Sequence, residues 1–252
     1  MKTKIEQGDI YKIGEHIIGC GDSLNAEFVR KVIGNNKIRA IICDPPYGIS
    51  YVEGKKYLNQ KLGVDSNKAI VGDQLQTDEE YAFFTKSWLG LVIPYLETYN
   101  ACYIFNSDLM FPALRQGMKE AGFHYSQMII WFKNQVVMNR KDYLMMFELI
   151  AYGWFGKHKM ERTKAKSVLF HPKPSASRLH PTQKPVGLLR KLIPNSTKIH
   201  EYVYDPFLGS GSTAVACEHL GRRCIGIEID PEYVSISIAR LEKLTGTEAC
   251  KI

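Results

Sequence analysis

The chain has 252 residues, of which 45% are hydrophobic and 23% charged, and its formal net charge is +7. This composition is typical of a soluble globular protein with a sizeable core, in one large α/β domain or two small ones. The lack of a signal peptide, and of any apolar run near the roughly 20 residues that cross a bilayer, argues against secreted and membrane proteins, so we expect a cytoplasmic protein.

The first part of the chain predicts strands and helices in alternation. In chain order, these are a strand at 15–20, a helix at 25–33, a strand at 38–43, a helix that begins at 77, a strand at 101–105, a helix at 109–121 and strands at 127–132 and 147–154. Thr77 and Glu80 form a capping-box pattern ahead of an amphipathic run. The polar, aperiodic residues before them predict a long, mobile loop at 53–76.

A basic stretch follows at residues 157–180. It contains seven basic residues against the single acid Glu161, namely Lys157, Lys159, Arg162, Lys164, Lys166, Lys173 and Arg178. A localised positive field of this kind is expected of a protein that binds a polyanion. A solvated loop that aids solubility is the alternative interpretation, and charge alone does not decide between them.

The remaining chain returns to regular alternation. A helix is predicted at 182–193, a strand at 202–204, a helix at 211–220, a strand at 224–229 and a closing helix at 231–244. About seven strands alternating with helices predict a Rossmann-like α/β fold, with a mostly parallel sheet covered by helices on both faces. We therefore expect a single domain over residues 1–252, with a small basic insertion at 155–180.

The tetrapeptide Asp44-Pro45-Pro46-Tyr47 stands at the end of an apolar strand pattern. Open α/β sheets place their chemistry at this point, where a strand ends and a loop begins. Two prolines remove two N–H donors and favour extended backbone, which leaves carbonyl oxygens unpaired beside a carboxylate and an aromatic ring. A rigid surface turn would use the same residues.

A second loop, Asp205 to Ala214, links a predicted strand to a helix. Gly209 and Gly211 permit a tight turn, and the helix N-terminus offers free N–H groups to an anionic ligand. Glu228 follows the next strand, where a carboxylate accepts hydrogen bonds from ribose hydroxyls in dinucleotide folds. This order of elements favours a nucleoside cofactor over a simple helix cap, although the glycines alone also fit a nicotinamide or flavin site.

Together the two loops resemble those of the amino-methyltransferases that use S-adenosylmethionine on DNA bases. His180-Pro181-Thr182-Gln183-Lys184-Pro185 is a third element of that family, and the order of the motifs is that of its permuted (beta) subgroup. The resemblance implies that Asp44 and the carbonyl of Pro45 or Pro46 accept both N–H groups of an exocyclic amine, while Tyr47 stacks on the base. Transfer would be direct, to a base flipped out of the duplex.

The resemblance also implies the remaining site residues. The expected cofactor contacts are Asp22, Thr182, Gln183, Lys184, Asp205, Pro206, Phe207, Gly209, Ser210, Gly211, Ser212, Thr213, Glu228 and Ile229. The basic stretch would hold DNA phosphates. Since the six cysteines show no C-x-x-C spacing, we expect no metal site. Glu148, inside an apolar run, is either a pocket group or a buried acid paired with lysine, and the predicted site does not include it.

The leading hypothesis is a DNA adenine-N6 methyltransferase that acts on double-stranded DNA. Transfer to cytosine N4 is the nearest alternative, and in the family an Asp at the first tetrapeptide position favours adenine. An RNA or protein-amide methyltransferase, a nicotinamide oxidoreductase and an inactive DNA-binding module are further alternatives. The subgroup often forms homodimers, and the sequence does not indicate whether a restriction nuclease accompanies the protein.

Overall fold

A computed structural model describes residues 4–49, 74–137, 142–172 and 183–252. Its elements are, in chain order, β1 (Ile10–Ile13), β2 (His16–Cys20), α1 (Ala26–Ile33), β3 (Ile38–Cys43), α3 (Asp78–Val92), the short 3-10 helix η1 (Ile93–Tyr95), β4 (Leu96–Asn106), α4 (Phe111–Glu120), β5 (Phe123–Val137), β6 (Met145–Phe155), β7 (Val168–Phe170), α5 (Val186–Ser196), β8 (Tyr202–Asp205), α6 (Ser212–His219), β9 (Arg223–Glu228), α7 (Pro231–Thr245) and β10 (Cys250–Lys251).

All the strands join one sheet, in the order β10-β1-β2-β9-β8-β3-β4-β6-β5-β7. Its centre, from β2 to β4, is parallel, whereas β6 runs antiparallel to both β4 and β5. The carboxyl ends of β2, β3, β4, β8 and β9 therefore lie at one edge of the sheet, which we call the carboxyl edge. The opposite edge, where these strands begin, is the amino edge. Ligands of open α/β sheets bind at the carboxyl edge.

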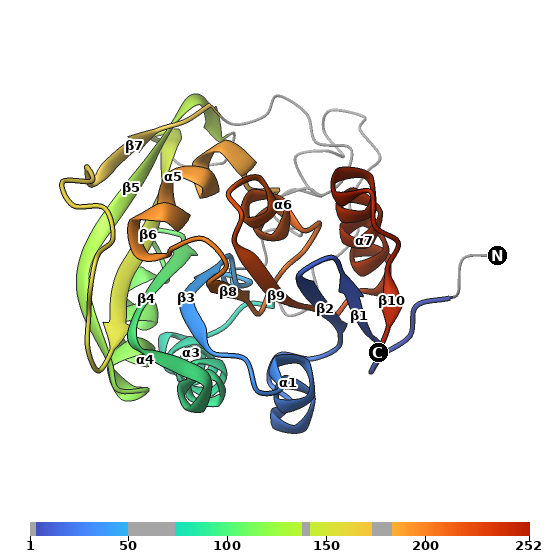
Figure 1. The fold of residues 1–252 in the computed structure, drawn as a ribbon. Coiled ribbons are helices and arrows are strands. Elements are labelled where there is room, and N and C mark those ends of the chain that lie inside the picture. Colours follow the sequence, from blue (N-terminus) through green and yellow to red (C-terminus); the bar gives the residue numbers. More distant parts are fainter. Residues whose placement is uncertain (1–3, 50–73, 138–141, 173–182) are drawn as a thin grey trace, which may run out of the picture.

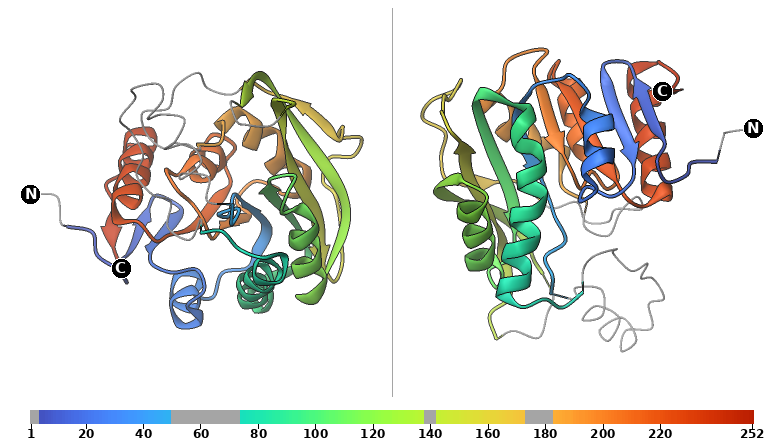
Figure 2. Two further views of the ribbon diagram at one scale, coloured as in Figure 1. Left: turned by 180° about the vertical axis from the view of Figure 1, so that it is seen from behind. Right: turned by 90° about the horizontal axis from the view of Figure 1, so that it is seen from below.

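The predicted α/β class is confirmed, but about seven strands is too few: the described residues form ten. The three additional strands, β1, β7 and β10, have only four, three and two residues. Segments this short carry almost no periodicity of their own and become strands through their neighbours. Among the described residues, β10, for example, pairs only with β1, so the first described strand and the C-terminal strand lie side by side (Figures 1 and 2).

The helix starts follow local capping chemistry. At α3, Thr77 Oγ1 accepts from the Glu80 N–H at 3.2 Å and Glu80 Oε2 accepts from the Thr77 N–H at 2.8 Å, so the predicted capping box is confirmed. Asn25 caps α1 through the Phe28 N–H. The helix predicted from 182 begins later, at Val186, with Pro185 at the N-cap and not at the first helical position.

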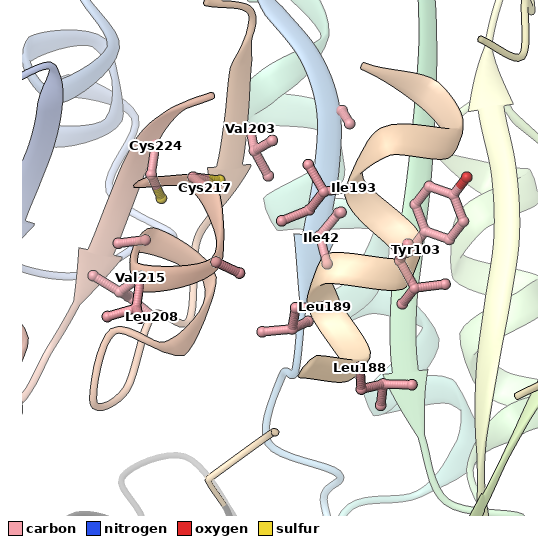
Figure 3. Packing of buried hydrophobic residues seen from close by; sticks show 14 of the residues in the cluster. Ile42, Tyr103, Leu188, Leu189, Ile193, Val203, Leu208, Val215, Cys217 and Cys224 are labelled. Carbon is pink, nitrogen blue, oxygen red and sulfur yellow. The ribbon is translucent and has the colours of Figure 1, made fainter. Parts of the chain in front are cut away.

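Helices cover both faces of the sheet (Figure 1). On one face, α5, α6 and α7 pack over the centre, and Figure 3 shows Leu189 and Ile193 of α5 beside Ile42 of β3. On the other face α1, α3 and α4 cover a second core that includes Trp88 and Ile104. This double burial explains why β3 is apolar throughout, apart from Arg39. Within the described ranges, no helix is long and apolar enough to span a membrane.

Arg39 is the charged exception in β3, and only 4% of it is exposed. Its guanidinium donates to the carbonyl oxygens of Tyr99 and Lys159 and to Glu161 Oε1, at 3.0 Å, and lies 3.4 Å from Glu201 Oε2. Since Arg39 stands near the start of β3, these contacts attach residues 159–161 to the amino edge.

Replacing Arg39 with methionine should lower the free energy of unfolding by about 3 kcal/mol, because two acids and two carbonyl oxygens lose a partly buried cationic partner. Urea denaturation would measure the loss. Lys31→Met is the matched control, since Lys31 pairs with Glu27 at an exposed i,i+4 position and its loss should cost less than about 0.5 kcal/mol. Equal losses in the two variants would show that Arg39 contributes only as surface charge.

Candidate active site

The tetrapeptide Asp44-Pro45-Pro46-Tyr47 leaves β3 at the carboxyl edge, as predicted. Tyr47 folds back so that its hydroxyl donates to Asp44 Oδ1 at 2.7 Å. Gly48 then adopts a left-handed conformation (φ 66°), and its carbonyl accepts from the Gln76 N–H at 2.9 Å. The predicted mobile loop at 53–76 lies outside the described residues except for its last three.

The carbonyl groups of Pro45 and Pro46 accept no hydrogen bond within the part of the chain that the structure describes. Pro45 is buried and Pro46 half-buried. A buried carbonyl without a donor is unfavourable unless a ligand supplies one. The predicted pair of acceptors, the Asp44 carboxylate and a proline carbonyl, is therefore available at this edge.

Asp44 is part of a cluster of four charged groups. Lys184 Nζ lies 2.5 Å from Asp44 Oδ2 and 3.1 Å from Glu148 Oε2. Lys133 Nζ lies 2.5 Å from Glu148 Oε1, on the side away from Lys184. The Tyr47 hydroxyl approaches Glu148 Oε2 to 3.4 Å. Two acids and two bases thus alternate as Asp44, Lys184, Glu148, Lys133, a sequence in which each charge faces an opposite one.

Burial sets the protonation of this charged cluster. Desolvation raises the pKa of Asp44, which Lys184 opposes and the Glu148 charge reinforces. Desolvation also acts on Glu148, but Lys184 and Lys133 together hold its pKa below the usual range. The pKa of Lys184 is raised, because the two carboxylates outweigh burial. Glu148 and Lys184 are therefore charged at neutral pH, and Asp44 is the group nearest to accepting a proton.

The sequence analysis considered Glu148 as an acid paired with lysine but left it out of the predicted site, and it missed Lys133. Glu148 lies on β6 directly opposite Trp131 of β5, and Lys133 follows Trp131 by two residues, so all three share one face of the sheet. Lys133 is 1% exposed and stacks over the Trp131 ring at 4.8 Å. An isolated charge inside each of two apolar strands was the available signal, since such charges are rarely buried without a partner.

The resemblance placed Lys184 beside the cofactor, whereas the structure places its ammonium group on Asp44. Gln183 is the residue before it in the same short segment ahead of α5. Thr182 and His180 lie outside the described residues. The structure therefore connects the third motif of the sequence to the tetrapeptide.

The second loop, between β8 and α6, holds its own buried acid. Asp205 Oδ2 accepts from the Thr213 hydroxyl at 2.6 Å, and its Oδ1 accepts from the Phe207 N–H at 3.0 Å. Burial raises the pKa of Asp205 to about 7 in spite of these two donors. Gly211 has a left-handed conformation (φ 81°), and a Cβ there would lie 2.8 Å from Ser237 Oγ. These residues fix the shape of the turn at the start of α6.

Glu228, at the end of β9, accepts a hydrogen bond from the backbone of the same loop. Its Oε2 accepts from the Gly209 N–H and its Oε1 from the Asp230 N–H, both at 2.8 Å. The Gly21 N–H donates to the Glu228 carbonyl at 2.9 Å, which brings Asp22 next to Glu228. Asp22 is exposed and accepts from the Leu24 N–H, and Asn25, not Asp22, caps the following helix. The predicted contacts Asp22 and Glu228 thus lie together.

Phe207 is held by two aromatic residues of α3. Its ring packs edge-on against Trp88 with centroids 5.6 Å apart, and tilted against Phe84 at 5.7 Å. Since Phe207 remains half-exposed, it presents an apolar surface beside the polar loop. Helix α3, from the first half of the chain, therefore positions the loop from Asp205 to Ala214 in the second half.

The donor set of this loop fits a nucleoside cofactor such as S-adenosylmethionine. Glu228 accepts one backbone donor at each oxygen, and a carboxylate oxygen has a second lone pair for a hydroxyl. Asp22 offers a further carboxylate two residues beyond β2, at the same edge. The N-terminus of α6 begins at Ser212 with no side-chain cap, so its N–H groups face the loop.

The five predicted DNA contacts that lie within the described residues are not brought together with this site. Lys157, Lys159, Arg162, Lys164 and Lys166 are exposed. However, Arg39 and the carbonyl of Asn195, which accepts from the N–H groups of Glu161 and Arg162, attach the start of the stretch to the amino edge. β7 then runs parallel to β5 back toward the carboxyl edge. Lys173 and Arg178, further along, lie outside the described residues.

Fold and site together define a Rossmann-like α/β protein in which the charged cluster around Asp44 and the loop from Asp205 to Ala214 share one edge of the sheet. A family model described as a DNA methylase, N6_N4_Mtase, matches residues 38–239. The chain belongs to this family. It is 30% identical over 234 residues to the Type II methyltransferase M2.DpnII of Streptococcus pneumoniae, covering 80% of this chain and 81% of the relative.

A further relative and two solved structures are also similar to this chain. The Type II methyltransferase M.HinfI of Haemophilus influenzae is 27% identical over 240 residues, covering 85% of this chain and 66% of the relative. The M1.HpyAVI–SAM complex superposes with a TM-score of 0.64 and 26% identity, covering 88% of this chain and 98% of the other. The cytosine-N4-specific PvuII DNA methyltransferase gives a TM-score of 0.70 over 93% of this chain and 92% of the other, and at 19% identity this similarity concerns the fold.

Proposed function

We propose that this protein transfers a methyl group from S-adenosylmethionine to the N6 amino group of adenine in double-stranded DNA. The observation that carries the proposal is the position of the tetrapeptide. The Asp44 carboxylate and the proline carbonyls, which accept no hydrogen bond from the described residues, lie at the carboxyl edge that also holds Glu228 and the 205–213 loop. Membership of the DNA methylase family supplies the reaction class, and the solved SAM complex of a relative supports the cofactor.

One group of residues would bind the cofactor, and another would activate the amine of the base. Asp22, Glu228 and the loop from Asp205 to Thr213 would hold S-adenosylmethionine. When bound, it supplies a methyl group whose bond to the sulfonium sulfur breaks as the new N–C bond forms, which leaves a neutral thioether. Asp44 and the carbonyl of Pro45 would each accept one N–H of the amine, which draws its nitrogen toward tetrahedral geometry and frees its lone pair. Tyr47 would stack on the base. As the new N–C bond forms, the proton that leaves the nitrogen passes to Asp44, directly or through water.

The choice of adenine over cytosine depends on the first residue of the tetrapeptide. Both targets are exocyclic amines, and the matching family includes N6 and N4 enzymes. Asp at this position is the family pattern that favours adenine, and it supports N6 transfer here. Incubation with labelled S-adenosylmethionine and mixed-sequence DNA, followed by digestion to nucleosides, tests the proposal. Labelled N6-methyladenine is expected; N4-methylcytosine would overturn the substrate, and unlabelled DNA would overturn the reaction.

A homodimer is part of the proposal and is supported by exposed apolar side chains on the edge strand β7 and its neighbour β5. The rings of Phe132 of β5 and Phe170 of the edge strand β7 have centroids 6.1 Å apart, and both residues are more than one-third exposed. Val168 extends the same surface.

We expect the basic stretch to bind DNA phosphates away from the reacting base. The double substitution Lys164→Glu and Lys166→Glu should weaken DNA binding and lower the slope of log K against log salt by about 2, one unit for each lost phosphate contact. Because the stretch is attached to the amino edge, kcat at saturating DNA should change little. Fluorescence anisotropy at several salt concentrations would measure binding.

The matched control for the basic stretch is Lys12→Glu with Lys243→Glu, which makes the same change in net charge at exposed positions of β1 and α7. This control should leave the salt slope within about 0.5 of the wild-type value. If both double variants reduce the slope equally, the effect is one of overall charge and the basic stretch is ordinary solvated surface.

A further inference from the structure

We propose that Lys184 is a positioning residue that keeps Asp44 ionised and oriented in the buried pocket, and that Glu148 and Lys133 hold Lys184 in place for that purpose. This inference rests on the proposed function, because it concerns how Asp44 remains a hydrogen-bond acceptor for the amine. It assigns to Lys184 a role different from the cofactor contact that the resemblance implies.

The geometry of Lys184 argues for this role. Its side chain is 9% exposed, and its ammonium group lies 2.5 Å from Asp44 Oδ2, 3.1 Å from Glu148 Oε2 and 3.3 Å from the Tyr47 hydroxyl. The ammonium group also lies 5.2 Å from the centroid of the Phe105 ring and 5.6 Å from that of Tyr47. The ammonium group thus donates to Asp44 and to the Tyr47 hydroxyl and forms an ion pair with Glu148, so its contacts all lie within the charged cluster.

The charges around Asp44 explain why such a partner is needed. Asp44 has Glu148 as an acidic neighbour, whose charge makes ionisation of Asp44 less favourable, and Asp44 in turn raises the pKa of the nearby Asp205. A protonated Asp44 would offer an O–H to the incoming amine in place of one of its two acceptor oxygens. Lys184 is the cation in direct contact, and without it burial and the charge of Glu148 would favour the neutral acid. The groups that face Asp44 are Tyr47, Lys184, Glu148, Asp205 and, behind Glu148, Lys133.

Glu148 and Lys133 complete the arrangement. Glu148 bridges the two lysines with one oxygen on each, so it gives Lys184 a second carboxylate partner besides Asp44. Lys133 balances the second carboxylate, which leaves the cluster with two positive and two negative charges. Removing Glu148 or Lys133 would leave the cluster with an uncompensated buried charge. Glu148 pairs with Trp131 of β5 in the antiparallel ladder, which gives Lys184 an anchor on the sheet.

The experiment compares Lys184→Met with Lys184→Arg and with Lys191→Met, an exposed lysine of α5 that receives the same substitution. The acidic limb of the kcat/KM pH profile should move to higher pH by about 1–3 pH units in Lys184→Met, since an opposite charge at this distance has that effect on a carboxyl group. Lys184→Arg should restore most of the wild-type profile, and Lys191→Met should retain it. Affinity for S-adenosylmethionine, measured by calorimetry, should change less than about threefold, under 1 kcal/mol.

Titration of the Asp44 carboxyl carbon by NMR of labelled aspartate, with Asp44→Asn to assign the signal, gives a reading that needs no activity. The Asp44 pKa should be higher in Lys184→Met than in the wild type. An unchanged Asp44 pKa would overturn the inference, as would an unchanged pH limb together with weaker cofactor binding. Inactivity of the wild-type protein on DNA would overturn the proposed function instead, and the titration would still decide the role of Lys184. Where Lys184→Met fails to fold, Lys184→Gln serves in both measurements.

Discussion

Replacing Asp44 with alanine should lower kcat for DNA methylation by roughly 10³-fold, in the range observed when an enzyme loses a proton acceptor or a preorganised polar group. Asp44 is the side chain that both accepts an N–H of the amine and takes the released proton in the proposed mechanism. Cofactor affinity should stay within about threefold, under 1 kcal/mol, because Asp44 makes no hydrogen bond to the 205–213 loop or to Glu228 among the described contacts. Single-turnover transfer of labelled methyl groups measures the first quantity, and calorimetry the second.

Asp44→Asn is the sharper version of this test. It keeps the shape of the side chain but replaces one acceptor oxygen with an NH₂ donor that faces Lys184 and the amine. We expect nearly the same loss of activity as for alanine. Asp78→Ala, at an exposed position in the first turn of α3, should leave transfer unchanged. Substantial activity in both Asp44 variants would show that the proline carbonyl alone activates the amine.

Replacing Glu228 with alanine should weaken S-adenosylmethionine binding by about 100-fold. Two charge-assisted hydrogen bonds, to the N–H groups of Gly209 and Asp230, disappear together with the acceptors for the ribose. Each such bond contributes about 1.5–3 kcal/mol, and 1.4 kcal/mol corresponds to a tenfold change in affinity. Isothermal calorimetry with the purified protein would measure the effect directly.

Glu228→Gln should lose less affinity than Glu228→Ala, because one of its side-chain oxygens can still accept. Glu248→Ala, at an exposed position near the C-terminus, is the control and should bind the cofactor normally. Normal binding by Glu228→Ala would move the ribose site elsewhere, with Asp22 as the next residue to test. The two main predictions thus separate chemistry from binding: Asp44 variants should bind without transfer, and Glu228 variants should fail at binding.

The sequence by itself determined the reaction class and the positions of both loops. Asp44 and Glu228 are 184 positions apart in the chain, but each follows an apolar strand, and parallel strands bring their carboxyl ends to one edge. Short-range chemistry was equally readable, as the capping box of Thr77 and Glu80 shows, because its partners lie three residues apart. These features depend on local pattern and on one general rule of sheet architecture.

Tertiary structure alone decided how the pocket is charged and where the basic stretch lies. The pairing of β5 with β6 sets Lys133 beside Glu148, and the path of the chain into α5 sets Lys184 between Glu148 and Asp44. Arg39 holds the start of the basic stretch at the amino edge, away from Asp44. None of these contacts is local: each joins residues at least 15 positions apart. The register of the antiparallel strands and the course of the loops set these contacts. Neither produces a periodic pattern in the sequence.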